Sequence, residues 1–129
     1  MLKLLAGQPP LVEGMPDVAR QLQPNGIDLT LRSIARFVGS GQLAVDDAAR
    51  QLAETEPLEY DADGYVRLAP GTYLITFNEA VHLPLDLAAL GRPRSSLLRC
   101  GAAIHTAVWD AGYSGRSQAL LVVYNQRGI

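Results

Sequence analysis

Apolar and polar residues alternate over several short stretches in the second half of the chain, a pattern typical of strands with one buried face. Glycine and proline punctuate these stretches, and residues 69–72 hold the Pro-Gly pair of a type II turn. Short strands separated by such residues favour a mostly-β sandwich or barrel. We predict five strands here, over residues 65–68, 73–77, 80–84, 103–108 and 119–124.

The first half of the chain is less regular. Residues 15–23 predict a short helix that starts near a proline, and a Pro-Asn-Gly turn follows it. Residues 27–32 alternate again and predict a strand. We predict a second short helix over residues 45–53, because two aspartates lie in its first turn. The acidic stretch 54–64 is predicted to be an exposed loop.

Two short segments interrupt the strands of the second half. Residues 95–99 predict one helical turn, with Ser95 as its cap and Gly101 as its stop. Residues 110–115 predict a tight loop, because Gly112 and Gly115 lie within it. Polar residues that adjoin such loops are candidates for chemistry.

Composition places the chain among single-domain globular proteins. It has 129 residues, 48% hydrophobic and 19% charged, which suffices for a core without disulfides. The single cysteine, Cys100, excludes an internal disulfide, is consistent with a cytoplasmic location and is expected to be a buried filler residue. We find no secretory signal and no apolar stretch long enough for a membrane span, so we expect no membrane partner.

Charge is distributed unevenly along the chain. The formal net charge is −2, which argues against a nucleic-acid partner. Residues 92–129 nevertheless hold five arginines and a single acid, Asp110, a net charge of +4. A basic segment around one acid suits a small anionic ligand, although arginines scattered over a solvated face are an equally open interpretation.

Arg94, Ser95 and Ser96 are candidates for binding that anion. An arginine offers forked donors that match phosphate oxygens, and free backbone N–H groups at the start of a helical turn add to them. The alternative is a capped helix that carries a surface arginine.

Asp110 follows an apolar stretch and opens the glycine-containing loop. A carboxylate there can accept a proton from water and orient it, or it can simply form the turn. Tyr113, three residues on, can pack against a sugar or against its own fold. We interpret His105 as structural and Trp109 as a packing residue that can also form one wall of a base pocket.

Together these residues resemble the dUTPase / dCTP-deaminase superfamily. The run from Gly91 to Arg99 (GRPRSSLLR) resembles its Arg-Ser-Ser-Leu motif, and the run from Thr106 to Gly115 (TAVWDAGYSG) resembles its Asp-x-x-aromatic-x-Gly motif. Asn25 to Leu29 resembles a further Gly-x-Asp-Leu motif. The run HTAVWDAGY is especially similar to the archaeal dUTPase branch.

The resemblance implies a fold and a set of roles. It implies a distorted β jelly roll with a few short helices, which assembles as a homotrimer with active sites between subunits. Asp110 matches the residue that activates the attacking water, and Tyr113 the aromatic residue that stacks on deoxyribose. Asp28 matches a residue that supports the metal region indirectly. The remaining matches bind substrate: Arg94 and Ser95, with Ser96 beside them, hold phosphate, and the backbone of Thr106, Ala107 and Val108 reads the pyrimidine.

The implied reaction is hydrolysis of dUTP to dUMP and pyrophosphate with Mg²⁺. Phosphoryl transfer depends mainly on positioning and charge stabilisation. Mg²⁺ dehydrates reluctantly, so we expect the triphosphate and water to supply most of its ligands, with no direct protein ligand.

Two alternatives share this fold. Deaminases of the family use a glutamate on the strand after the aspartate loop, whereas residues 116–124 contain no acid and place Leu120 and Leu121 there. A non-catalytic relative is the other alternative, because fold does not guarantee function. Family members usually continue past residue 125 with a further strand and a tail. We therefore expect a domain that lacks the usual C-terminal motifs and has reduced activity.

Overall fold

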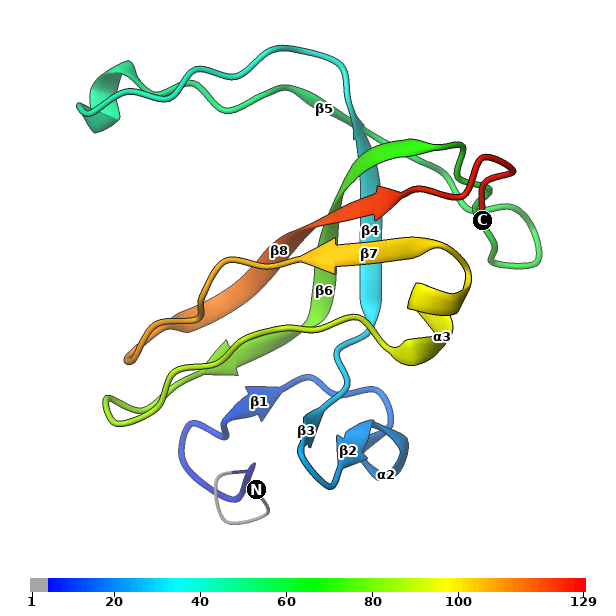
Figure 1. Ribbon diagram of the computed structural model, residues 1–129. Helices are drawn as coiled ribbons and strands as arrows, with labels where there is room; N and C mark the ends of the chain where they lie inside the picture. Colours follow the sequence, from blue (N-terminus) through cyan, green and yellow to red (C-terminus); the bar gives the residue numbers. More distant parts are fainter. Residues whose placement is uncertain (1–4) are drawn as a thin grey trace.

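The computed structural model describes residues 5–129, and its largest feature is an antiparallel sheet (Figure 1). The strands are paired in the order β5-β4-β6-β8-β7, and β1 pairs with the far end of β6. A second, two-stranded sheet joins β2 and β3. The elements are β1 Val12–Glu13, α2 Val18–Gln21, β2 Leu22–Gln23, β3 Gly26–Ile27, β4 Leu31–Phe37, η1 Asp47–Ala49, β5 Thr55–Pro57, β6 Gly71–His82, α3 Ser95–Arg99, β7 Ala102–His105 and β8 Ser114–Val123.

Strand β6 forms the centre of the sheet. The sequence predicted two strands here, over 73–77 and 80–84, but the structure has one strand that ends at His82. Its register against β8 shifts between Thr76 and Ala80, which is where the sequence pattern had suggested a break. Side chains 73, 75, 77, 79 and 81 are buried and face one way, as expected for a strand of period two.

The predicted strand over 27–32 is confirmed only at its two ends, which belong to β3 and β4. Residues 28–30 lie between β3 and β4 and form no ladder, and β4 begins at Leu31. Asn78 on β6 causes part of this irregularity, because its backbone N–H donates to the Thr30 carbonyl at 2.9 Å. Its side-chain amide donates to the Thr30 hydroxyl at 2.9 Å and to the Leu31 carbonyl at 3.1 Å. The register of β4 on β6 shifts just beyond this point.

Beyond β4 and β5 the chain projects from the sheet as an arm, residues 38–54 (Figure 1). Its two sides are joined by backbone hydrogen bonds, including the reciprocal pair between Gln42 and Gln51 at 2.8 and 3.0 Å. The helix predicted over 45–53 is therefore mostly wrong, since only the short 3-10 turn η1 is present. The predicted loop 54–64 contains β5, which pairs with β4. Local propensity is overridden here by strand pairing.

Three other predictions need correction. The helix predicted over 15–23 is confined to α2, where the Asp17 side chain accepts from the Arg20 N–H as the cap. Residues 65–68 are not a strand, although Leu68 exchanges two backbone hydrogen bonds with Ile129, at 2.8 and 2.9 Å. The strand predicted over 103–108 is β7, which ends at His105.

The core lies on one face of the sheet. It is built from inward residues of β6 and β8 together with residues of the connecting segments. Trp109 is buried within it and packs its ring against Phe77, with ring centroids 6.4 Å apart. In residues 5–129 we find no helix with the length and apolar character that crossing a membrane requires. The mostly-β character is confirmed, whereas the jelly-roll description and the trimer stay predictions.

Candidate active site

An open groove of about 940 Å³ lies between the segment around β3 and the segment that leads into α3. Its walls are largely apolar and include Phe77, Val81 and Trp109 of the core. Its charged lining residues, among those the structure describes, are Asp28, Arg92 and Arg94. A mostly apolar groove with a few convergent charged groups is the usual form of a small-molecule site.

Arg94 and Asp28 meet at the edge of this groove. The guanidinium Nη1 lies 2.7 Å from Asp28 Oδ2, in an ion pair whose angles fall short of a hydrogen bond. The Arg94 side chain is 68% exposed and the Asp28 side chain 23%. Solvent screens such a pair, so we assign it a role in orientation rather than in stability. The guanidinium keeps donors free for an anion.

The helical turn predicted over 95–99 is confirmed as α3, and Gly101 follows its end. The predicted cap is wrong, because Arg94 occupies the cap position and makes no side-chain cap hydrogen bond. Ser95 is instead the first helical residue. Ser95 and Ser96 are both exposed, and Ser96 lines the groove beside Arg94. Their hydroxyls are therefore accessible to a ligand.

Gly91 allows the segment before α3 to approach the segment after β7. Its N–H donates to Thr106 Oγ1 at 3.2 Å. A Cβ at position 91 would lie 2.6 Å from Thr106 Cγ2 and 3.1 Å from the Trp109 ring. Two backbone bonds between Ala89 and Trp109, each 3.0 Å, hold the same contact. This packing fixes one wall of the groove.

Residues 106–108 run past the end of the β7–β8 ladder, whose last pair is His105 with Leu120. Thr106 lines the groove, while Ala107 and Val108 are exposed. These three residues have no ladder partner, so their backbone N–H and C=O groups can hydrogen-bond a ligand.

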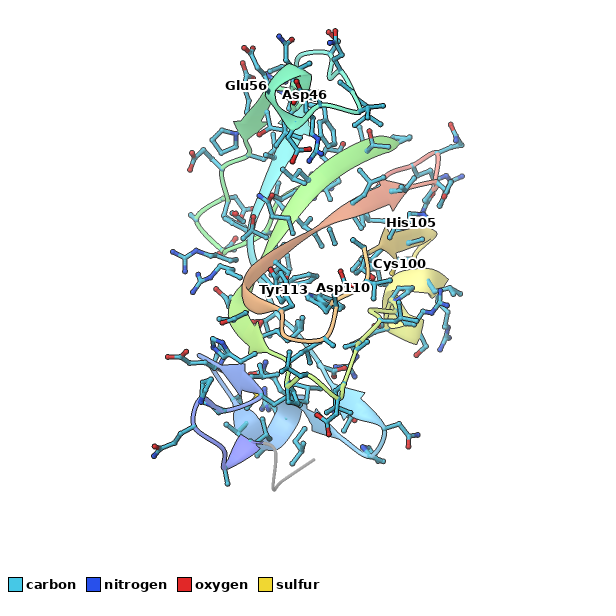
Figure 2. The ribbon with its side chains drawn as sticks, turned by 90° about the vertical axis from the view of Figure 1, so that its left-hand side faces the viewer. Asp46, Glu56, Cys100, His105, Asp110 and Tyr113 are labelled. Atoms are coloured by element: carbon cyan, nitrogen blue, oxygen red, sulfur yellow. The ribbon has the colours of Figure 1, made fainter. Side chains whose placement is uncertain are left out.

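Asp110 and Tyr113 occupy the turn that leads into β8 (Figure 2). The Tyr113 N–H donates to the Asp110 carbonyl at 3.0 Å, and Gly112 has a φ of +80°, which a type II turn requires at that position. The Gly112 N–H donates to the Pro84 carbonyl at 3.3 Å, which anchors the turn to the end of β6. The Asp110 carboxylate is exposed and can reach solvent.

A buried chain of hydrogen bonds fixes the tyrosine. Trp109 Nε1 donates to Ser117 Oγ, and the Ser117 hydroxyl donates to the Tyr113 oxygen at 3.1 Å. Trp109 and Ser117 are each 7% exposed. Gly115 lies beside the ring, since a Cβ there would be in ordinary contact with the Tyr113 oxygen at 3.5 Å. The interpretation of Trp109 as a packing residue that also lines a pocket agrees with this arrangement.

The predicted site residues fall into two groups within one chain. Arg94, Ser96 and Thr106 line the groove, whereas Tyr113 lines a separate, smaller cavity beside His82. Asp110 lines neither of these two cavities among the described residues. Trp109 lines the groove and is followed directly by Asp110, so it connects the groove residues to the Asp110–Tyr113 turn.

Two further interpretations can be compared with the structure. Cys100 was expected to be buried and is exposed, because it lies at the end of the short α3 rather than inside the sheet. His105 is the last residue of β7 and is also exposed. Figure 2 shows both on the side of α3 and β7.

Sequence reasoning missed three buried polar residues that lie next to the site. They are Glu79, Gln21 and Ser117. Glu79 occupies an inward position of β6 and is completely buried. An acid at an apolar position of an alternating strand was the available signal. Ser117 offered no comparable signal, since its role depends on the position of Trp109.

No group of three or more histidine, cysteine or acidic side chains capable of holding a metal occurs in residues 5–129. Asp28 is the acid that lines the groove among the described residues, and Arg94 already engages it. A Mg²⁺ ion carried by a nucleotide fits this donor set only as an ion ligated mainly by phosphate and water.

The chain belongs to the dCTP deaminase-like family, which it matches over residues 10–129. It is 49% identical over 127 residues to a protein of Methanosarcina mazei named probable deoxyuridine 5'-triphosphate nucleotidohydrolase, covering 98% of this chain and 74% of that protein. A protein of Archaeoglobus fulgidus with the same name is 47% identical over 119 residues, covering 92% and 70%.

A solved structure is also similar, that of 2'-deoxycytidine 5'-triphosphate deaminase from Agrobacterium tumefaciens. The TM-score is 0.65 and the identity 26%, and the match covers 95% of this chain. The chain spans 40% of the length of that deaminase chain. The family predicted from the motifs is thereby confirmed.

Proposed function

We propose that the protein hydrolyses dUTP to dUMP and pyrophosphate. The observation that carries the proposal is the Asp110–Tyr113 turn, which presents an exposed carboxylate and a fixed tyrosine beside Trp109 of the groove. The names of the relatives from Methanosarcina mazei and Archaeoglobus fulgidus support the choice of dUTP. We infer a cytoplasmic location from the single, unpaired cysteine.

The chemical step assigns one role to each group. Asp110 accepts a proton from water, and the oxygen of that water attacks the α-phosphorus while pyrophosphate leaves. Arg94 binds phosphate oxygens through its free donors, with the Ser95 and Ser96 hydroxyls beside it. Bound Mg²⁺ would offset phosphate charge, and Asp28 would hold one of its waters.

Specificity follows from shape and from the backbone. The unpaired backbone at Thr106, Ala107 and Val108 suits recognition of the pyrimidine edge, because a site built to hydrogen-bond a base rejects one that leaves donors unpaired. The Tyr113 ring packs against the sugar, where an added 2'-hydroxyl would be crowded.

We infer that the working form is a homotrimer with active sites between subunits. In one chain Arg94 lines the groove, whereas Tyr113 lines the smaller cavity and Asp110 lines neither, so a second copy can bring the two groups together. The arm adds a second argument: Leu43 and Leu52 are 89% and 82% exposed, and Val45 is fully exposed. Side chains of this kind, gathered on one projection, are typical of a surface that another chain covers.

A dCTP deaminase is the second candidate, which the fold of the Agrobacterium tumefaciens enzyme favours. Against it, β8 carries no acidic residue that could activate water at the base. A nucleotide-binding protein without catalysis is the remaining alternative.

The test is pyrophosphate release from dUTP and from dCTP with Mg²⁺, with Asp110→Asn as the matched variant. Release from dUTP that collapses in the variant supports the proposal. Ammonia from dCTP would instead support the deaminase. Binding of dUTP with no product from either nucleotide would support the non-catalytic alternative.

A further inference from the structure

Glu79 is a completely buried carboxylate that the proposed reaction does not use. It lies on β6, at the register shift against β8, and its side chain belongs to the inward row of that strand. A carboxylate removed from water is retained only when its oxygens are hydrogen-bonded. Its partners therefore indicate what it holds in place.

Both carboxylate oxygens accept hydrogen bonds from the chain around residues 21–30. Gln21 Nε2 donates to Oε1 at 2.6 Å, and the Thr30 hydroxyl donates to the same oxygen at 2.7 Å. The Thr30 backbone N–H donates to Oε2 at 2.9 Å. Three donors on one buried acid form a satisfied polar cluster, which specifies a single arrangement of the groups around it.

Gln21 of this cluster also hydrogen-bonds both the N–H and the carbonyl of Asp28. Gln21 Nε2 also donates to the Asp28 carbonyl at 2.8 Å, and the Asp28 N–H donates to the Gln21 carbonyl at 2.8 Å. Gln21 is itself buried, and its side-chain oxygen accepts from the Asp17 N–H at 3.0 Å. The backbone of Asp28 is thus held by a residue whose own position Glu79 fixes.

The hydroxyl of Thr30 links Glu79 to Asn78. It already accepts from Asn78 Nδ2 at 2.9 Å, so its proton points to Glu79. An amide in place of the carboxylate has an NH₂ group at one of the two oxygen positions. At Oε2 this group would face the Thr30 N–H, and at Oε1 it would face Gln21 Nε2 and the Thr30 hydroxyl. Glu79→Gln therefore preserves volume and introduces a donor against a donor.

We propose that Glu79 is a positioning residue that fixes Asp28, and through Asp28 the guanidinium of Arg94, for binding of the triphosphate. The inference rests on the proposed function, in which Arg94 holds phosphate. The side chain of Arg94 is 68% exposed and has many rotamers, so a fixed carboxylate 2.7 Å away selects the orientation that meets the ligand.

The test compares Glu79→Gln with Glu56→Gln. Glu56 is an exposed glutamate on β5 that pairs with Arg36 through bonds of 2.6 and 3.0 Å, and it has no contact with the cluster. Binding of a non-hydrolysable dUTP analogue and of dUMP is measured for both variants. We expect Glu79→Gln to weaken binding of the triphosphate analogue about tenfold, the scale of one charge-assisted contact. Binding of dUMP should weaken less. Glu56→Gln should change neither.

A double variant identifies the route of the effect. If Glu79 acts through Arg94, Glu79→Gln adds little to the loss already caused by Arg94→Ala, because the two changes remove one interaction. Additive losses, or equal losses for dUMP and the triphosphate analogue, would overturn the proposal. If Glu79→Gln does not fold, Thr30→Ala replaces it in the same binding measurements, because it removes one of the three hydrogen bonds to Glu79.

Amide hydrogen exchange at residues 27–31 can be measured without nucleotide. It therefore tests the positioning role independently of the proposed dUTP hydrolysis. Faster exchange there in Glu79→Gln, with β8 unchanged, supports the positioning role even if the wild-type protein fails to hydrolyse dUTP. Unchanged exchange at these residues would overturn the role whatever the enzyme assay shows.

Discussion

The carboxylate of Asp28 and the guanidinium of Arg94 lie 2.7 Å apart, although the two residues come from opposite sides of the groove. The Asp28 oxygen is buried, but the Arg94 side chain is 68% exposed and solvent screens its charge, so the pair contributes about 0–1 kcal/mol to stability. Asp28→Asn should therefore leave the denaturant midpoint almost unchanged and raise the KM for dUTP. Asp63→Asn, at an exposed site in the loop before β6, is the control. A large loss of stability in Asp28→Asn would contradict the assignment.

Asp110→Asn should remove most of the turnover while nucleotide binding persists. The amide keeps the shape of the side chain and cannot accept the proton, a loss worth roughly 10²–10⁴-fold in kcat. Pyrophosphate release and calorimetric binding measure the two quantities separately. Asp86→Asn, an exposed aspartate after β6, should retain activity. Equal turnover in Asp110→Asn and wild type would exclude Asp110 as the base.

Gly91→Ala should destabilise the fold by about 1–3 kcal/mol, because the added methyl overpacks a filled site. Thr106 Cγ2 would lie 2.6 Å from the new carbon. Gly26→Ala is a matched control, since a Cβ there meets nothing within 4 Å. Denaturant unfolding gives the two free energies. Similar values for both variants would show that the 89–91 segment can move away from Thr106 without cost.

Ser117→Ala should leave the Trp109 N–H and the Tyr113 hydroxyl without their buried partner. The expected cost is about 1–3 kcal/mol. We also expect poorer discrimination of dUTP from UTP, because the Tyr113 ring loses its fixed orientation. Ser33→Ala, on the exposed side of β4, should affect neither measurement. Discrimination that stays intact while stability falls would limit Ser117 to a structural role.

Val45→Asp combined with Leu52→Asp should weaken self-association. Both positions are exposed on the arm, so a charge costs little in the single chain and much in an apolar interface. Sedimentation over a range of concentrations measures the change. Val18→Asp, an exposed valine on α2, is the control. An unchanged assembly would show that the arm lies outside the interface.

The sequence predicted the second half of the molecule better than the first. β8 and α3 were recognised because their signals are local: alternation for one, and a stop at Gly101 for the other. Alternation predicts a strand through residues 28–30, because it cannot report the hydrogen bonds that Thr30 accepts from Asn78 and donates to Glu79.

The candidate site was predicted residue by residue through motif resemblance, whereas its support was not. Arg94 and Thr106 line one groove, and their roles there stay predictions. The predicted burial of Cys100 is wrong because it followed from the residue type, which does not guarantee burial at the end of a five-residue helix. Tertiary position decided the outcome in each of these cases.

The central place of β6 has a consequence for synthesis on the ribosome. Val81 pairs with Val12, and Gly71 pairs with Val123, so the strand needs partners that are distant in sequence on both sides. The central strand therefore cannot complete its pairing until the residues of β8 have left the ribosome. Non-local pairing of this kind slows folding and leaves strand edges open meanwhile. We expect nascent chains of this protein to depend on chaperone protection until β8 has emerged.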